Sequence, residues 1–267
     1  METKQRPDLL YGNCLELMRD IPDRSVDMIL TDPPYGVLHK GNPNAKWDIA
    51  VPFDSLWEQW ERIIKPNGVI VVFGQGMFTA KLMTSNPKMW RYNLVWDKRL
   101  VTGFLNAKKM PLRRHEDICV FYKQRPTYNP QMSRCDPHRR NHQRGKNVGV
   151  DSIPTNRNYG RYYNTPTVMS DEKYPTSIIS IAKQHPSKRT FHPTEKPIDL
   201  LRWLIRTFTN DGDIVLDCFM GCGSTGVACK REHRRFVGIE KEKEFYDIAV
   251  MRCESEVEQL KLNFDIE

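Results

Sequence analysis

Long apolar segments are missing from this 267-residue chain. No run approaches the roughly 18 consecutive apolar residues that a membrane-spanning helix needs. The first residues, Met1 to Asp8, are polar and lack the apolar core of a secretory signal. These absences argue against a membrane protein, and we expect a soluble, cytoplasmic protein with no membrane partner.

Cysteine is present, but without the spacing of a disulfide framework or of a metal site. The chain has seven cysteines, an odd number, and several lie in apolar stretches typical of a core. Cys218 and Cys222 are not followed by a second pair at metal-binding spacing. We therefore expect no metal site, and we assign no cysteine as a nucleophile.

Acidic residues are scarce in residues 124–190. This region holds twelve Lys or Arg residues against four Asp or Glu residues, so it accounts for the whole formal charge of +8. Tyrosines and amide side chains are interleaved with the cations, and the one apolar run is short, Ile178 to Ala182. Cations for phosphates together with aromatic rings and amides for bases indicate an insertion that reads nucleic acid. A solvated, partly disordered loop is the alternative, since disordered chains have a similar composition.

Elsewhere, short apolar runs alternate with amphipathic segments. Strands that alternate with helices predict an α/β fold with an open, largely parallel sheet covered on both faces. A turn at Pro66-Asn67-Gly68 is expected to separate a helix from the strand that follows it. The expected strands are residues 8–13, 26–30, 69–73, 92–96, 117–122, 214–218 and 235–239, and the expected amphipathic or helical segments are residues 15–21, 56–65, 77–85, 198–208, 225–231 and 242–260.

The second expected strand ends abruptly at Thr31-Asp32-Pro33-Pro34-Tyr35. Because neither proline has an N–H and Pro34 restricts Pro33 to extended angles, the Pro33 carbonyl is left as an acceptor beside the Asp32 carboxylate. Tyr35 adds an aromatic face for stacking. Two acceptors and a ring fit a planar base with an exocyclic amino group, such as adenine or, less well, cytosine. A proline-rich turn with a helix-capping aspartate is the purely structural alternative.

A long polar stretch, residues 36–54, follows this motif. Loops of this length without internal structure are commonly functional. We expect the loop to act as a lid or to contact nucleic acid through Lys40 and Trp47. A plain surface loop is the alternative.

A second motif, Gly221-Cys222-Gly223-Ser224-Thr225-Gly226, lies between an expected strand and an expected helix. It matches G-x-G-x-x-G, in which glycines let the backbone approach a nucleotide closely. Glu240 ends the next strand, about twenty residues on, where a carboxylate can accept hydrogen bonds from both ribose hydroxyls. The pattern predicts an adenosine-containing cofactor and does not by itself separate a dinucleotide from S-adenosylmethionine. The motif Asp32-Pro33-Pro34-Tyr35, which we call the Asp32 motif, favours S-adenosylmethionine, because a methyl donor beside a captured amino group makes a complete reaction.

Together, Asp32-Pro33-Pro34-Tyr35 and Asp217-Cys218-Phe219-Met220-Gly221-Cys222-Gly223 resemble the motifs of DNA amino-methyltransferases, the adenine-N6 and cytosine-N4 family. The order of the motifs, with His192 to Pro197 before the glycine loop, resembles the beta class of that family. The resemblance covers nearly the whole chain. It implies a Rossmann-like, S-adenosylmethionine-dependent methyltransferase fold, circularly permuted, with a mixed, mostly parallel sheet.

The resemblance also implies a role for each part of the chain. Residues 1–123 would form the catalytic half, residues 124–190 a target-recognition insertion, and residues 191–267 the cofactor-binding half. A base flipped out of the double helix would be held by the catalytic set Asp32, Pro33, Pro34 and Tyr35. The expected cofactor-binding residues are Asn13, Asp32, Thr194, Lys196, Asp217, Phe219, Gly221, Gly223, Ser224, Thr225 and Glu240, with Thr194 and Lys196 near the carboxylate end of the cofactor. The expected DNA-binding residues are Lys40, Trp47, Arg134, Arg139, Arg140, Arg144, Lys146, Arg157 and Arg161.

The implied reaction is site-specific methyl transfer from S-adenosylmethionine to adenine N6 in double-stranded DNA, as in restriction–modification systems. Cytosine-N4 methylation is the nearest alternative, and Asp32 favours adenine because family members that act on cytosine more often have Ser in its place. RNA methylation, a nicotinamide-dependent oxidoreductase and a catalytically silent DNA-binding protein are more distant alternatives. Dimerisation is common in the resembled class, and a cognate restriction endonuclease would be a further partner.

One departure from the family concerns the cofactor. The family usually has Gly-Asp where this chain has Gly12-Asn13. The amide oxygen of Asn13 can accept a hydrogen bond from the cofactor's adenine, but without charge, so we expect a weaker contact there.

Overall fold

The computed structural model describes residues 8–38, 45–134, 172–183, 191 and 194–264. The chain divides into two compact units, one formed by residues 1–129 with 176–267 and the other by residues 130–175. In the smaller unit, the described elements are two short antiparallel strands, β6 (Ser133–Arg134) and β7 (Glu172–Lys173).

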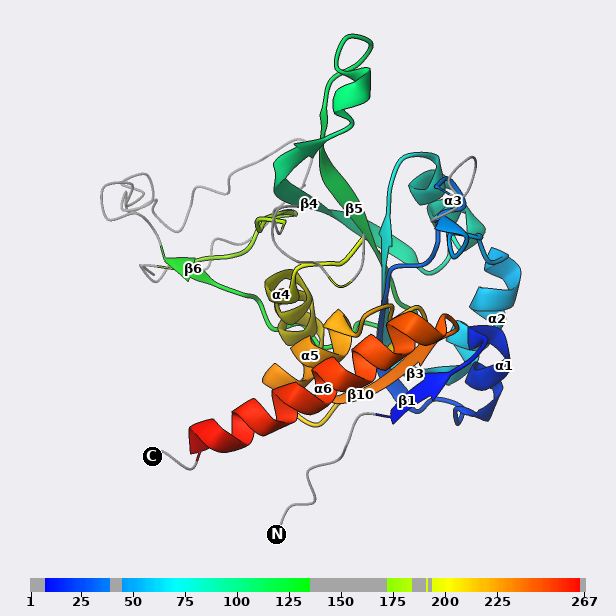
Figure 1. The fold of residues 1–267 in the computed structure, drawn as a ribbon, viewed down its shortest axis with the longest axis vertical. Helices are drawn as coiled ribbons and strands as arrows, with labels where there is room; N and C mark the ends of the chain where they lie inside the picture. Colours follow the sequence, from blue (N-terminus) through cyan, green and yellow to red (C-terminus); the bar gives the residue numbers. More distant parts are fainter. Residues whose placement is uncertain (1–7, 39–44, 135–171, 184–190, 192–193, 265–267) are drawn as a thin grey trace, which may run out of the picture. The chain divides into compact units, whose positions relative to one another are not determined.

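The described part of the larger unit is built on an eight-stranded sheet (Figure 1). The strand order is β1-β10-β9-β2-β3-β5-β4-β8. Strand β5 runs antiparallel to both of its neighbours, and the other adjacent pairs are parallel. The predicted mixed, mostly parallel sheet is therefore confirmed. The strands are β1 (Asp8–Tyr11), β2 (Val26–Thr31), β3 (Ile64–Gly74), β4 (Trp90–Thr102), β5 (Arg113–Phe121), β8 (Ile178–Ser180), β9 (Ile214–Asp217) and β10 (Arg235–Glu240).

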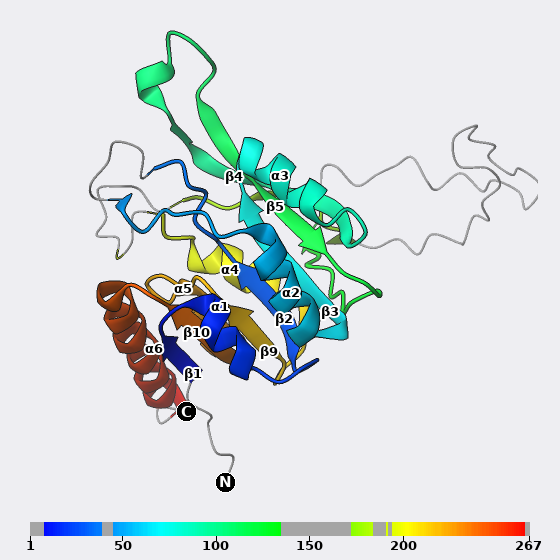
Figure 2. The same ribbon diagram turned by 90° about the vertical axis from the view of Figure 1, so that its right-hand side faces the viewer.

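Helices cover both faces of the sheet (Figure 2). Helices α4, α5 and α6 pack on one face, and α1, α2 and α3 pack on the other. No helix in the described ranges is long and apolar enough to span a membrane. The helices are α1 (Cys14–Leu17), α2 (Phe53–Ile63), α3 (Met77–Ser85), α4 (Ile198–Phe208), α5 (Ser224–Arg231) and α6 (Lys243–Phe264), with the 3-10 turns η1 (Met18–Asp20) and η3 (Phe104–Asn106).

Neighbouring side chains on the central strands point to opposite faces of the sheet. On β2, Met28 and Leu30 belong to the core beneath α4, whereas Ile29 belongs to the core beneath α2. On β3, Val71 and Ile70 divide in the same way. All five side chains are fully buried. Burial on both faces explains why these strands are continuous apolar runs in the sequence.

The start of β3 differs from the expectation drawn from sequence. Ile64 already pairs with Val26 of β2, so the strand begins before the expected turn. The register between β2 and β3 shifts at residues 66–68, and pairing with β2 resumes at Val69. Helix α2 accordingly ends at Ile63 rather than at Lys65.

Strand β8 lies inside the region that we expected to be an insertion, residues 124–190. It nevertheless belongs to the main sheet, because Ile178–Ser180 pair in parallel with β4. The smaller unit is accordingly shorter than the expected insertion. Only Ile179 of this three-residue strand is buried, which is too weak a signal to separate it from its polar surroundings.

Strands β4 and β5 are longer than expected. Strand β4 continues beyond residues 92–96, and β5 begins before residue 117. The additional residues form a hairpin whose side chains are mostly exposed, so no apolar alternation marks them in the sequence.

Candidate functional site

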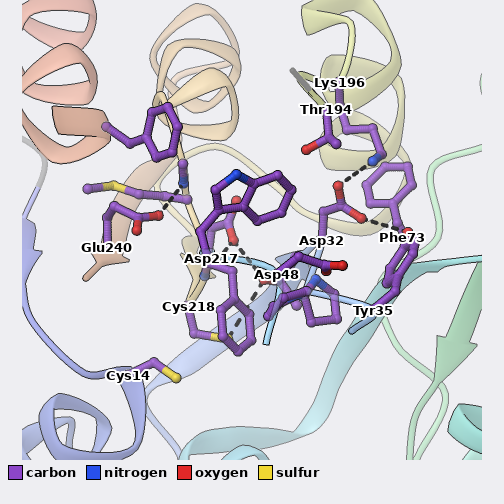
Figure 3. Close-up of a pocket in the computed structure, with 18 of the residues that line it drawn as sticks. Cys14, Asp32, Tyr35, Asp48, Phe73, Thr194, Lys196, Asp217, Cys218 and Glu240 are labelled. Atoms are coloured by element: carbon purple, nitrogen blue, oxygen red, sulfur yellow. Dashed lines mark hydrogen bonds and ion pairs between the residues drawn. The ribbon is translucent and has the colours of Figure 1, made fainter. Parts of the chain in front are cut away.

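The ends of strands β2, β9 and β10 open into a cavity of about 560 Å³. This volume lies in the range of roughly 300–1,000 Å³ typical of small-molecule sites. Figure 3 shows Glu240 and Asp32 on opposite sides of the cavity with Asp217 between them, and we call these sides the Glu240 end and the Asp32 end. The expected residues that line it are Asn13, Asp32, Pro33, Pro34, Tyr35, Trp47, Thr194, Lys196, Asp217, Phe219, Gly221, Ser224, Thr225 and Glu240.

Backbone N–H groups orient the carboxylate at the Glu240 end. Gly221 donates its N–H to Oε2 of Glu240 at 2.9 Å, and Glu242 donates its N–H to Oε1 at 2.8 Å. Gly221 has φ +51°, a conformation that glycine adopts without strain. Burial raises the pKa of Glu240, while these N–H groups oppose the rise. Each carboxylate oxygen keeps acceptor capacity toward the cavity.

Gly223 differs from the other expected glycine because it is not among the residues that line the cavity. It has φ +78°, and a Cβ placed on it would lie 2.9 Å from Cα of Ala249 in α6. The absence of a side chain at Gly223 therefore permits close packing of the glycine loop against α6.

Asp217 joins the two motifs. Its Oδ1 accepts hydrogen bonds from Oγ1 of Thr31 at 2.7 Å and from the N–H of Phe219 at 3.1 Å, and its Oδ2 accepts one from Oγ1 of Thr225 at 2.6 Å. Burial raises the pKa of Asp217 to about 6, against the effect of these donors. The aspartate thus ties the end of β2 to the loop after β9.

Side chains hold the carboxylate at the Asp32 end. The Tyr35 hydroxyl donates to Oδ1 of Asp32 at 2.8 Å, and Nζ of Lys196 forms an ion pair with Oδ2. Burial raises the pKa of Asp32, and Lys196 opposes that rise. Burial also raises the pKa of Tyr35, so the phenol stays a neutral donor.

Lys196 lies between two carboxylates. Its Nζ is 3.5 Å from Oε2 of Glu116, which in turn pairs with Lys98 at 3.2 Å through Oε1. Burial alone would lower the pKa of Lys196, but Asp32 and Glu116 raise it. Lys196 was expected near the carboxylate end of a cofactor, and the structure places its ammonium on Asp32.

The two remaining features of the Asp32 motif also have defined surroundings. Within the described residues, the carbonyl of Pro33 accepts no hydrogen bond, and Pro33 lines the cavity. The ring of Tyr35 packs against Phe78 with ring centroids 4.5 Å apart and planes inclined by 32°. Phe78 therefore supports the tyrosine, which itself lines the cavity.

Asn13 caps helix α1. Its Oδ1 accepts a hydrogen bond from the N–H of Leu15 at 2.9 Å, the geometry of an N-cap residue. The amide oxygen that was expected to face a cofactor is thus already engaged. The amide nitrogen of this cavity-lining residue is the group left to act as a donor.

The lining residues that were not predicted include Lys98, Glu116 and Asp48. Lys98 and Glu116 lie where β4 and β5 border the cavity. Asp48 is 2% exposed, and its carboxylate accepts hydrogen bonds from the backbone N–H groups of residues 36–38. It thereby fixes the loop that follows Tyr35. The one sequence signal for Asp48 was its place beside Trp47 in a long polar loop.

Seven of the nine expected DNA-binding residues lie outside the described ranges. Trp47 lines the cavity, and Arg134 lies in β6 of the smaller unit. Within the described ranges, no cluster of three potential metal ligands occurs. The expected residues that lie outside the described ranges are Lys40, Arg139, Arg140, Arg144, Lys146, Arg157 and Arg161.

Sequence comparison relates the chain to DNA-modifying enzymes. A family model for DNA methylases, N6_N4_Mtase, matches residues 26–251. The Type II methyltransferase M.HpaI of Haemophilus parainfluenzae is 27% identical over 258 residues, which cover 93% of this chain and 74% of that protein. The Type II methyltransferase M.HinfI of Haemophilus influenzae is 28% identical over 279 residues, which cover 91% of this chain and 67% of that protein.

Solved structures share the fold. The M1.HpyAVI–SAM complex matches with a TM-score of 0.59 and 24% identity, covering 92% of this chain and 98% of that one. The cytosine-N4-specific PvuII DNA methyltransferase matches with a TM-score of 0.65 and 17% identity, covering 93% and 89%. These similarities confirm the predicted Rossmann-like methyltransferase fold.

Proposed function

Because this chain belongs to the N6/N4 family of DNA methylases, we propose that it transfers a methyl group to N6 of an adenine flipped out of double-stranded DNA. S-adenosylmethionine is the cofactor and supplies the methyl group. The proposal rests on one observation above all: Asp32 and Pro33 line the same cavity as Glu240. Acceptors for an amino group and an acceptor for ribose hydroxyls therefore share one enclosed space.

The Glu240 end fits the adenosine part of the cofactor. Glu240 is held by two backbone N–H groups and keeps acceptor capacity for ribose hydroxyls. Phe219 and Phe245 line the same space and provide apolar surface for a base. Asn13 can donate a hydrogen bond from its amide nitrogen, in place of the acceptor that the sequence suggested.

The Asp32 end fits the reactive amino group. The Asp32 carboxylate has about four acceptor positions, of which Tyr35 and Lys196 use two. The remaining acceptor capacity, together with the Pro33 carbonyl, can accept both N–H bonds of an exocyclic amine. Such hydrogen bonds favour a pyramidal nitrogen with an available lone pair, and they stabilise the positive charge that develops on it.

Flipping a base out of the helix costs a few kcal/mol. Tyr35 offers stacking that contributes about 1–3 kcal/mol per base. Because Phe78 packs against this ring, the stacking surface is held in place before DNA binds. A supported ring loses little freedom on binding, so more of its stacking energy offsets the cost of flipping.

Cytosine-N4 methylation is the second candidate. The same two acceptors suit the amino group of cytosine, and the PvuII enzyme that shares the fold is cytosine-N4-specific. We favour adenine because the motif begins with Asp32 rather than with serine. The two curated relatives are Type II methyltransferases, so we also propose that this chain is the modification partner of a restriction endonuclease.

The test is methylation of unmodified bacterial DNA with S-adenosylmethionine labelled in its methyl group. The DNA is then digested to nucleosides, and sequencing of modified bases maps the recognised site. We expect the label in N6-methyladenine, confined to one short sequence. Label in N4-methylcytosine would replace the adenine assignment by the second candidate, and absence of label in DNA would overturn the proposed function.

A further inference from the structure

The hairpin formed by β4 and β5 extends beyond the rest of the sheet (Figures 1 and 2). Pairing of β3 with β5 reaches only Asp117, and pairing of β8 with β4 reaches only Asp97. Residues 98–115, which we call the β4–β5 arm, continue past these points. Within the arm, Thr102 pairs with Arg113, and the 3-10 turn η3 forms the tip.

The tip exposes large apolar side chains. Phe104 is 77% exposed and Leu105 is 82% exposed, and they follow Gly103, which has φ +85°. Val101 and Met110 are also at least half exposed. Clustered apolar side chains in solvent mark a surface that binds something.

The charge of the arm indicates what it binds. Residues 98–115 contain six Lys or Arg residues and no Asp or Glu. Lys108 and Lys109 lie next to the apolar tip, are exposed and have no ion-pair partner among the described residues. Apolar side chains bordered by unpaired cations fit a polyanion with apolar surface between its charges, which is the chemistry of stacked bases between phosphates.

The arm also borders the cavity. Lys98, at the base of the arm, and Thr102, at the end of β4 next to the tip, line the cavity. Arg113 donates a hydrogen bond to Gln75, another lining residue, at 2.7 Å. Only Gly103 separates the cavity-lining Thr102 from Phe104. A nucleotide that enters the cavity thus leaves its parent duplex close to the tip.

We propose that the β4–β5 arm is a wedge that opens the DNA duplex. Phe104 and Leu105 enter the base stack beside the target nucleotide and fill the space that it vacates, while Lys108 and Lys109 contact adjacent phosphates. The inference rests on the proposed function, because it requires a flipped base. A second copy of this chain is a weaker match for the arm, since two arms of like charge repel each other.

The experiment compares two duplexes that carry the mapped recognition site. In one duplex the target base is paired, and in the other it faces an abasic site, so it is already unpaired. The enzymes are the wild type, the double variant Phe104→Ala/Leu105→Ala, and Met251→Ala as a control. Met251 is apolar and 51% exposed but lies on α6, away from the arm.

On paired DNA we expect kcat/KM of the double variant to fall roughly 10- to 100-fold, the range expected for lost stacking. On unpaired DNA it should stay within about twofold of wild type, because the wedge acts before the base is free. Met251→Ala should match wild type on both DNAs. Equal losses on the two DNAs, or no loss on paired DNA, would overturn the wedge alone, whereas methylation of neither DNA by wild type would overturn the proposed function as well.

Two further measurements separate the remaining outcomes. Lys108→Gln/Lys109→Gln should reduce the slope of log affinity for DNA against log salt by about 1.8, because two phosphate contacts are lost. An unchanged slope would contradict the phosphate contacts. If Phe104→Ala/Leu105→Ala changed the oligomeric state in sedimentation but left methylation intact, the arm would be an interface between copies and the wedge would be wrong.

Discussion

At the Glu240 end of the cavity, backbone N–H groups hold the carboxylate, whereas at the Asp32 end the side chains of Tyr35 and Lys196 hold it. The partners of Glu240 lie 2 and 19 residues away in sequence, but Lys196 lies 164 residues from Asp32. The Glu240 end is therefore built within one segment of the chain, and the Asp32 end is complete only when segments far apart in sequence come together.

This difference has a functional counterpart. The backbone N–H groups that position Glu240 are neutral and fixed, so they leave the charge of its carboxylate unneutralised. A charged acceptor held in this way suits reversible binding of a ligand. At the Asp32 end, Lys196 and Glu116 place charges around the acceptor, which suits a site where charge develops during reaction. We expect substitutions at the Glu240 end to change affinity and substitutions at the Asp32 end to change rate.

The largest expected effect is that of Asp32→Ala. The rate of methyl transfer at saturating substrates should fall by about 100- to 1,000-fold, the usual cost of losing one preorganised charge-stabilising group. The affinity for S-adenosylmethionine, measured by calorimetry, should stay within a few-fold of wild type. A variant that lost cofactor affinity but kept its rate would reverse the contrast between the two ends.

The next effect is that of Glu240→Gln. Affinity for S-adenosylmethionine should fall about 10- to 100-fold, because the hydrogen bonds to a charged acceptor become weaker neutral ones. The rate should recover at saturating cofactor. Glu244→Gln, an exposed position in the first turn of α6, is the matched control and should leave both quantities unchanged. If the rate of methyl transfer by Glu240→Gln stayed low at saturating S-adenosylmethionine, Glu240 would contribute to the reaction as well as to cofactor binding.

Asp217, between the two ends, gives a smaller effect that depends on pH. Its pKa of about 6 in the folded protein exceeds the ordinary value of 3.8, so as the pH falls through 6 the folded state takes up a proton that the unfolded state does not. Wild type should therefore gain about 1 to 2 kcal/mol of stability over Asp217→Asn, which cannot titrate, when the pH is lowered from 7.5 to 5. Urea unfolding of both proteins at the two pH values measures this, and a difference independent of pH would contradict it.

The smallest effect concerns Asn13, which we expect to act mainly through structure. Asn13→Ala removes the N-cap of α1 and should lower the free energy of unfolding by about 0.5 to 1 kcal/mol. Asn13→Asp keeps the cap and should unfold like wild type. If the free energy of unfolding fell in both Asn13→Ala and Asn13→Asp, the amide nitrogen, rather than the N-cap oxygen, would be what stabilises the protein.

The contrast between the Glu240 end, which is local in sequence, and the Asp32 end, which is not, explains how much of the site the sequence could predict. The glycine loop and Glu240 lie within one strand–helix–strand segment, so their spacing alone located that end of the site. Helices α3 and α4 were predicted to the residue. In α4, the apolar positions recur at helical spacing, which marks the helix in the sequence.

The Asp32 end could be predicted only in part. Asp32 and its prolines form a local motif, but Lys98 and Glu116 reach the cavity through the pairing of β4 with β5, which no local pattern encodes. Lys196 was assigned to the cofactor by resemblance to the family, and nothing in its local motif indicates the ion pair with Asp32, 164 residues away. The β4–β5 arm was missed because its apolar side chains are exposed and do not alternate as those of a half-buried strand do.

The hydrogen bond from Thr31 to Asp217 also bears on how the protein is made. The two residues are 186 positions apart, and at a synthesis rate of 5–20 residues per second the ribosome makes the second about 10 to 40 s after the first. During that interval the Asp32 motif is complete but has no Asp217 to anchor it. The Asp32 motif can therefore reach its final arrangement only after the chain has been made as far as Asp217.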